Sequence, residues 1–587
     1  MERGYRRSRR LTGIVLILLL IGLVFALWYL RLRPRPEIVV RCVTPAAGES
    51  LLAAGEKAEA TPFLVEGQVI VMGPRSSVDE VVQAVRDQGI PLSDKPATDC
   101  DLGYVGALPR AGKLQSPAFP FAAEARRELV LRLYTLEPAP GQPSPTVGEA
   151  VRAIDRAGQG KSVFADPNYL IGLLAQSPCG EPYEPGASPY EPGASPYEPG
   201  ASPYGAVPLA ETEAADLFWG QWAFEHVGVG PSLHDVWEDT SPLATGAGVR
   251  VGIFDTSPFE PPPGAEGQPD DVPVQTSESV PWTDAELNAG TLTLQVLHRP
   301  VPPVAPLDPT VHADVRDHGL FVAGLVHAAA PGSEIQLIRV LNEYGCGDLF
   351  GLNRALFEFI AQMETDRQTL KGAVINLSLG VHQPDAADPV DEKTRLQPDV
   401  IGAAISLEEL SHLIDDRIET LQAVVYVATS RGAVVVAAAG NDSYLESAPL
   451  PMQLPAAYPF VIGVAASNDL RGRACFSNWG DVSAPGGDGG PNEEYSLACA
   501  PQQNLCQGDC RQAVISLAHG ADSGYAYWSG TSFSTPLVSG LAALVMESGA
   551  SSLAWISPNE VFNAIRCGAP TPDGVINMPA TLSRCVP

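Results

Sequence analysis

The strongest constraint on the fold is an alternation of apolar strands and helices in the second half of the chain. Apolar runs of strand length occur at 249–254, 334–340, 373–380, 433–440 and 460–466. Helical periodicity separates them, most clearly at 349–366 and 406–430. Continuous apolar runs are typical of strands buried on both faces of a parallel sheet, and their alternation with helices predicts an α/β domain. We therefore expect a mostly parallel sheet flanked by helices.

Chemically capable residues occur where such a sheet would present them. The carboxyl ends of parallel strands meet at one edge of the sheet, and functional residues gather there. The candidates are Asp255 after the run 249–254, His318 at the start of HGLFVAG, Asn441 after the run 433–440, and Ser532 in GTSFSTP (530–536) before an apolar helix. We expect these four side chains to lie together.

These four residue types suit nucleophilic attack on a carbonyl group. A serine hydroxyl is a weak nucleophile that needs a neighbouring base. A histidine can take its proton and return it to the leaving group, while an aspartate fixes the tautomer of the imidazole. The Asn441 amide and the Ser532 backbone N–H would bind the negative oxygen of the intermediate. Asp, His, Ser is one of three known chain orders for a serine triad.

In these motifs the chain resembles the subtilisin-like serine proteases, the subtilases. GTSFSTP matches the family's serine motif at every position, and VGIFDTS, HGLFVAG and AAAGN resemble its aspartate, histidine and oxyanion motifs. INLSLG resembles its substrate-pairing strand, and the resemblance covers about 205–570. It implies a serine endopeptidase of protein or peptide substrates with catalytic Asp255, His318 and Ser532, and Asn441 in the oxyanion hole. The substrate-binding residues it implies are Ser378, Leu379, Gly380, Ala438, Ala439 and Gly440.

The chain departs from the family pattern at two positions. Ser257 stands where the family has glycine, and we expect strain in that turn; Leu320 stands where the family has a hydroxyl. Neither change removes a catalytic group. The chemistry requires no cofactor or metal, and only the resemblance would allow a structural calcium ion, because no D-x-D-x-D-G loop is present. Two alternatives stay open: a catalytically silent binding protein of the same fold, and a peptide ligase or cyclase using the same triad.

The first half of the chain predicts a small α+β domain and a linker. Strand-like and helical segments alternate from about 66 to 172, a pattern that indicates one small domain. By the resemblance, residues 61–175 are an inhibitor-like propeptide that blocks the cleft until autocleavage, between about Tyr169 and the repeats. YEPGASP occurs three times at 183–203, and this density of proline predicts an extended linker over 176–205. The catalytic domain is then 206–587.

The N-terminus predicts a membrane anchor. Residues 11–30 carry no charge, and at about 1.5 Å per residue they would span the roughly 30 Å of a bilayer core. Arginines dominate the tail 1–10, which favours a cytoplasmic N-terminus, a single pass, a stalk at 31–60 and a catalytic domain outside the cytoplasm. A cleaved signal peptide is the alternative. The run is long for one, and no A-x-A-like site follows it.

The net charge and the cysteine content limit which kinds of partner and metal site we expect. The net charge is −31, which argues against a nucleic-acid partner. An exported body makes disulfides among the ten cysteines plausible, whereas zinc is disfavoured because paired C-x-x-C spacing is missing. The acidic, Pro-rich stretch 258–314 and the polar stretch 383–397 are expected to be surface insertions near the rim of the cleft.

Overall fold

The computed structural model describes most of two domains. Predictions on the membrane anchor, the YEPGASP repeats and the stretch 383–397 lie outside the residues it describes. Of the predicted stalk at 31–60 it describes only Arg41–Val43, and there the prediction is wrong, because these residues form a strand that pairs antiparallel with Asp99–Asp101. The described residues are 41–43, 64–105, 127–137, 146–159, 161–173, 179–180, 207–208, 214–229, 244–262, 273–283, 288–301, 305–306, 315–366, 372–381, 418–443, 449–487, 512–519, 521, 523–549, 556–569 and 574–586.

An eight-stranded sheet forms the centre of the larger domain, in the order β18-β17-β16-β14-β8-β12-β10-β9. Every neighbouring pair is parallel except β10 and β9, so the predicted mostly parallel sheet is confirmed. The strands are β8 (Val249–Asp255), β9 (Val274–Thr283), β10 (Ala289–His298), β12 (Glu334–Arg339), β14 (Gly372–Leu377), β16 (Ala433–Ala438), β17 (Ile462–Ser467) and β18 (Val482–Pro485).

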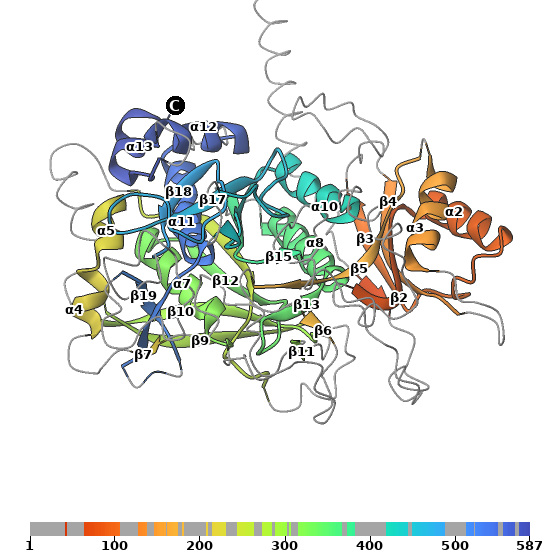
Figure 1. Ribbon diagram of the computed structural model, residues 1–587, viewed down its shortest axis with the longest axis horizontal. Helices are drawn as coiled ribbons and strands as arrows, with labels where there is room; N and C mark the ends of the chain where they lie inside the picture. The colour runs from red at the N-terminus through yellow and green to blue at the C-terminus, as the bar shows by residue number, and fades with distance from the viewer. Residues whose placement is uncertain are drawn as a thin grey trace, which may run out of the picture.

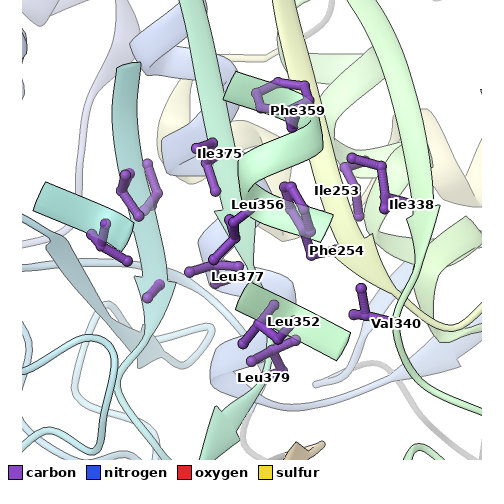
Figure 2. Close-up of a cluster of buried hydrophobic side chains, with 14 of the residues drawn as sticks. Ile253, Phe254, Ile338, Val340, Leu352, Leu356, Phe359, Ile375, Leu377 and Leu379 are labelled. Atoms are coloured by element: carbon purple, nitrogen blue, oxygen red, sulfur yellow. The ribbon is translucent and has the colours of Figure 1, made fainter. Parts of the chain in front are cut away.

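Helix α8 (Leu349–Asp366) covers one face of this sheet, as the periodicity at 349–366 predicts. Figure 2 shows Leu352, Leu356 and Phe359 of this helix beside apolar side chains of β8, β12 and β14. A side chain at Gly252 would meet the Phe359 ring, with Cβ 2.6 Å from Cε2. The glycine therefore lets the helix pack directly on the middle strand, which stabilises the sheet by burying apolar surface.

Helices α7 (His318–Ala329) and α11 (Thr531–Gly549) pack closely against each other. Residues Thr531 to Met546 of α11 are all buried, and a Cβ at Gly540 would collide with Cβ of Ala329. The remaining helices of this domain are α4 (Ala214–Trp219), α5 (Trp222–Val227), α10 (Glu419–Ser430), α12 (Pro558–Gly568) and α13 (Met578–Arg584). Of the helix predicted over 406–430, the structure describes only α10.

The smaller, N-terminal domain is α+β, as predicted, and lies at one end of the molecule (Figure 1). Its antiparallel strands follow the order β1-β3-β4-β2-β5, and Val78, Val81, Val82 and Val85 of α2 are buried. Its elements are β1 (Arg41–Val43), β2 (Leu64–Pro74), α2 (Arg75–Asp87), β3 (Thr98–Val105), β4 (Arg127–Thr135), α3 (Val147–Gly158) and β5 (Phe164–Gly172).

Short strands complete the structure. Two of them, β13 and β15, pair with β5 of the N-terminal domain. They are β6 (Cys179–Gly180), β7 (Val207–Pro208), β11 (Ala305–Pro306), β13 (Cys346–Asp348), β15 (Gly380–Val381), β19 (Val514–Leu517) and β20 (Tyr525–Trp528).

The interpretation of 258–314 as a surface insertion is wrong for much of its length. Strands β9 and β10 form a hairpin, and β10 pairs in parallel with β12, so the stretch extends the central sheet. The sequence VQTSESVPWT alternates exposed positions with half-buried or buried ones along β9. Polar residues occur on both faces of this edge strand, so its sequence lacks the continuous apolar run by which the other strands were predicted.

The disulfides and the membrane-spanning helix are both predicted for an exported protein. Cys567 and Cys585 form a disulfide, and Cys100, Cys346 and Cys475 are also disulfide-bonded. Within the described part of the chain, no helix is both long and apolar enough to cross a membrane. The predicted anchor at 11–30 is not part of it, so that prediction stays open.

We expect His327 to make the stability of the fold dependent on pH. Burial lowers the pKa of His327 from 6.5 to about 4, so the folded protein holds this imidazole neutral. The stabilisation is complete above pH 6.5 and is lost as the pH falls and the unfolded chain takes up the proton, by up to about 3 kcal/mol below pH 4. The His327 ring packs edge-on against Trp282, with 4.7 Å between centroids, a contact that phenylalanine can keep.

The measurement is the melting temperature of the purified protein between pH 7.5 and pH 5. His327→Phe should lose less stability on acidification than the parent. The same change at His519, which is exposed, serves as the control. An equal acid sensitivity of His327→Phe and the parent would contradict the expectation.

Candidate active site

The buried pair Asp255 and His318 forms the centre of the site. Asp255 ends β8, His318 begins α7, and their side chains are 0% and 3% exposed. The Asp255 Oδ1 and His318 Nδ1 atoms are 2.8 Å apart. A carboxylate in this position holds the imidazole in one orientation and leaves its Nε2 atom to exchange a proton.

Thr256 and Gly319 hold the two elements together. The Thr256 N–H donates to Asp255 Oδ1 over 2.7 Å, and the Gly319 N–H donates to Thr256 Oγ1 over 3.2 Å. A Cβ at Gly319 would collide with the Thr256 carbonyl oxygen and lie 3.0 Å from Cβ of Asp255. The glycine after the histidine is thus required by the close approach of α7 to β8.

Ser532 lies in the first turn of α11, at the positive end of the helix dipole. Its hydroxyl donates to the Ser378 carbonyl oxygen over 3.3 Å, while the Ser378 hydroxyl donates to the Ser532 carbonyl oxygen over 2.7 Å. Phe533 follows it, and its ring centroid is 5.1 Å from that of His318. The start of α11 is therefore positioned against both the imidazole and the strand that leads to β15.

Asn441 lies beside the start of α11, with its amide orientation determined by Thr531. The Asn441 Oδ1 atom accepts from the Thr531 N–H and from the Thr531 hydroxyl, each over 2.9 Å. Its amide nitrogen is then directed toward Gly530, where a Cβ would lie 3.6 Å from Nδ2. The amide can thus act as a hydrogen-bond donor next to Ser532.

Aromatic side chains shield the imidazole. The ring centroids of Trp528 and Phe533 lie 5.2 Å and 5.1 Å from that of His318. Phe321 contacts both of these rings. These aromatic rings limit the access of water to the imidazole and strengthen the electrostatic interactions within the site.

A strand of the N-terminal domain lies next to this site. Leu170 to Gly172 of β5 pair antiparallel with β13 on one side, and Ile171 and Gly172 pair antiparallel with β15 on the other. The Leu173 N–H donates to the Gly345 carbonyl oxygen over 3.1 Å. Leu170, Ile171 and Leu173 are at most 3% exposed. The space between β13 and β15, called the cleft below, is thus occupied by an extended segment of the chain, which is held by backbone pairing and by buried apolar side chains.

Two polar residues of β5 cap helices of the larger domain. Asp166 accepts the Thr420 and Glu419 N–H groups at the start of α10, over 2.6 Å and 3.2 Å. Asn168 accepts the Phe350 N–H at the start of α8, over 3.0 Å. Burial raises the pKa of Asp166 well above 3.8, and the bonds to Thr420 oppose that rise. These contacts satisfy helix-end N–H groups that lack partners within their own helices.

The expected site residues therefore lie together at the carboxyl edge of the sheet. Of the expected substrate-binding residues, Gly380 pairs with Gly172 of β5, and Ser378 contacts Ser532. The expected strain at Ser257 is not found: among the described residues other than glycine, only Arg471 has a positive φ. The other expected residues, Leu379, Ala438, Ala439 and Gly440, are buried.

Sequence reasoning missed one strand and three residues that contribute to the site. The second wall of the cleft is β13, whose only signal is the pair of glycines in GCGD between a strand and a helix. Thr256 and Thr531 carry no signal of their own, because their roles depend on contacts formed in the fold. The surrounding Trp528 resembles any core aromatic residue in the sequence.

An Asp–His pair and a serine at a helix start, on the carboxyl edge of a parallel sheet, are typical of a serine hydrolase. Residues 303–573 match the family model of the subtilase family. This match includes His318, Asn441 and Ser532, and Asp255 precedes it. This part of the chain is therefore similar to the subtilase family.

Curated proteins show the same likeness. The chain is 29% identical over 253 residues to a thermophilic serine proteinase of Bacillus sp. strain AK1, covering 41% of this chain and 45% of that protein. It is 28% identical over 246 residues to subtilisin Savinase of Lederbergia lenta, covering 40% and 64%. The chain thus spans about half the length of the first relative. Fervidolysin from Fervidobacterium pennivorans aligns over 89% of this chain and 62% of its own, with 19% identity and a TM-score of 0.43.

We expect Gly319→Ala to disrupt the Asp–His pair. The new methyl group would press on Thr256 and Asp255 and move the start of α7 away from β8. We expect a loss of about 1–3 kcal/mol in stability and a slower reaction of Ser532 with a fluorophosphonate probe, because the base is displaced. The control is Gly290→Ala in β10, where a Cβ would meet only the Trp282 carbonyl oxygen, at 3.7 Å. An unchanged labelling rate for Gly319→Ala would contradict this role.

Proposed function

We propose that this chain is a serine endopeptidase that hydrolyses peptide bonds through an acyl-enzyme on Ser532. The observation that carries the proposal is the buried Asp255–His318 hydrogen bond beside a serine at a helix start. The cleft between β13 and β15 supports it, because it pairs with an extended strand. Peptide chains are the substrates that such backbone pairing recognises.

The reaction begins when the Ser532 hydroxyl turns from the Ser378 carbonyl oxygen toward His318. Nε2 takes the hydroxyl proton as Oγ bonds to the substrate carbonyl carbon. Asn441 donates to the resulting oxyanion, and Asp255 stabilises the imidazolium. The C–N bond then breaks, and the imidazolium gives its proton to the leaving amine. The same imidazole then takes a proton from a water molecule as the water oxygen attacks the ester carbonyl carbon. The imidazolium returns this proton to Ser532 Oγ as the ester C–O bond breaks and the second product leaves.

The proposal includes a self-inhibited precursor. Strand β5 lies in the cleft, and the contacts of Asp166 and Asn168 add to its attachment. A substrate could not pair with β13 and β15 at the same time. We further propose that the apolar run at 11–30 anchors the protein to a membrane by a single pass, with the N-terminus cytoplasmic and the catalytic domain outside the cytoplasm.

We expect Ser532→Ala to abolish both probe labelling and peptide hydrolysis. The purified protein is treated with a fluorophosphonate probe and then with a peptide library, and products are identified by mass spectrometry. Labelling that is independent of Ser532 would contradict the proposed endopeptidase activity and would favour a catalytically silent binding protein. Ser532-dependent labelling that yields ligated rather than hydrolysed peptides would identify a ligase or cyclase.

We expect self-processing to cleave the bond between residues 174 and 175. In an antiparallel pair, a step forward on one strand corresponds to a step back on the other. Gly172 lies opposite Gly380, and Ser378, two residues before Gly380, contacts the Ser532 hydroxyl. The carbonyl attacked should therefore be that of Leu174, with Ala175 as the new N-terminus.

N-terminal sequencing and intact mass of the processed protein measure the bond directly. Ser532→Ala should keep residues 174 and 175 joined. A first cut elsewhere, or normal processing of Ser532→Ala, would contradict self-cleavage in this register.

A further inference from the structure

We propose that Asn478 is a positioning residue that holds the backbone on both sides of Asn441, so that the Asn441 amide is ready to donate to the oxyanion. The inference rests on the proposed function. Asn478 lies in the motif FSNWG (476–480), to which neither the triad nor the cleft assigns a role. Its side chain is 1% exposed, so it acts through its neighbours rather than by touching a substrate.

The side chain of Asn478 bonds to the residues that flank Asn441. Its Nδ2 donates to the Ala439 carbonyl oxygen over 3.3 Å and to Asp442 Oδ2 over 2.9 Å. Its Oδ1 accepts from the Asp442 N–H over 3.1 Å and from the Ser443 hydroxyl over 2.7 Å. Both donors and both acceptor positions of the amide are thus in use. No aspartate, serine or alanine can reproduce this set.

The backbone adds a further bond in the same place. The Asn478 N–H donates to the Gly440 carbonyl oxygen over 3.0 Å. Gly440 has a φ of +113°, and a Cβ there would collide with Asn478 Nδ2. Glycine therefore allows both the unusual turn and the close approach of the amide. Residues 439, 440 and 442 are all bonded to Asn478, and Asn441 lies between them.

The loop that carries Asn478 is itself well anchored. The Ser477 hydroxyl accepts the Ala466 N–H over 2.8 Å. Arg473 donates to the Ser477 carbonyl oxygen over 2.6 Å. On its other side, the Trp479 N–H donates to the Leu450 carbonyl oxygen over 2.9 Å. Asn478 is thus a rigid point against which the turn at Asn441 is held.

Two separate sets of contacts then determine the position and orientation of the proposed oxyanion donor, the Asn441 amide. Thr531 sets the rotation of the Asn441 side chain, and Asn478 sets the position of its backbone. A donor stabilises a developing charge well only if it is in place before the charge forms. A displacement of the turn should therefore weaken the transition state while leaving the pairing of substrate with β13 and β15 intact.

The experiment compares Asn478→Ala with wild type and uses a fluorophosphonate titration to count active sites, so that misfolded protein does not enter kcat. We expect kcat to fall by about 10- to 100-fold, less than the loss typical for a deleted oxyanion donor, with KM changed by less than about 3-fold. In an Asn441→Ala background the same substitution should lower kcat by less than about 3-fold, because the group it positions is gone.

The matched control is Asn468→Ala. Asn468 also accepts backbone N–H groups in a loop, from Leu470 over 3.1 Å and from Gly472 over 2.9 Å. It should keep the wild-type kcat, even if its melting temperature falls. If Asn478→Ala does not fold, Ser443→Ala removes one of the four side-chain bonds of Asn478 and should lower kcat by a smaller factor.

Two results would overturn the inference. One is a wild-type kcat for folded Asn478→Ala protein, or a wild-type kcat for Ser443→Ala if Asn478→Ala does not fold. The other is a loss of kcat as large in the Asn441→Ala background as in wild type, which would show that Asn478 acts elsewhere. Wild-type protein without Ser532-dependent turnover would instead refute the proposed function itself, so the two failures are distinguishable.

Discussion

The close packing of α7 against α11 determines the geometry of the site. His318 and Ser532 both lie in the first turns of these helices, and Gly540 meets Ala329 where the helices touch. Packed helices are rigid over this length because interiors are as dense as molecular crystals. The separation of the proposed base His318 and the proposed nucleophile Ser532 is thus determined by contacts well below the site. Loops at the surface can vary without moving either group.

Two glycines also help to fix the geometry of the site, because each allows two backbone segments to approach closely. Gly319 lets α7 approach β8 so that His318 reaches Asp255, and Gly440 lets the turn at Asn441 approach Asn478. Each is next to a residue whose side chain carries the proposed chemistry. Hydrogen bonds at these positions involve backbone groups that substitution cannot remove. The precision of the site therefore depends on close backbone approach more than on further charged side chains.

The central sheet could be predicted, and so could the placement of Asp255, His318, Asn441 and Ser532 at its carboxyl edge, because their signals are local. Apolar strands such as Val249–Asp255 and the helix Leu349–Asp366 show their periods within a few residues. Strand β9 was missed because its polar exposed face interrupts the apolar run. Contacts such as Asn478 with Ala439 and Asp442 join positions that are nearly 40 residues apart, and no pattern in the sequence specifies them before the chain has folded.

In the proposed precursor, strand β5 is held by two kinds of contact: backbone pairing within the cleft and side-chain bonds to the starts of two helices. Its last residues use the backbone pairing that any extended peptide would use, so this pairing alone cannot distinguish it from a substrate. Asp166 and Asn168 add contacts to two helix starts that a short peptide lacks. Tethered groups bind with a high effective concentration, and the two caps are attached to the same strand. After cleavage, the N-terminal domain should therefore leave the cleft more slowly than a peptide product of the same sequence.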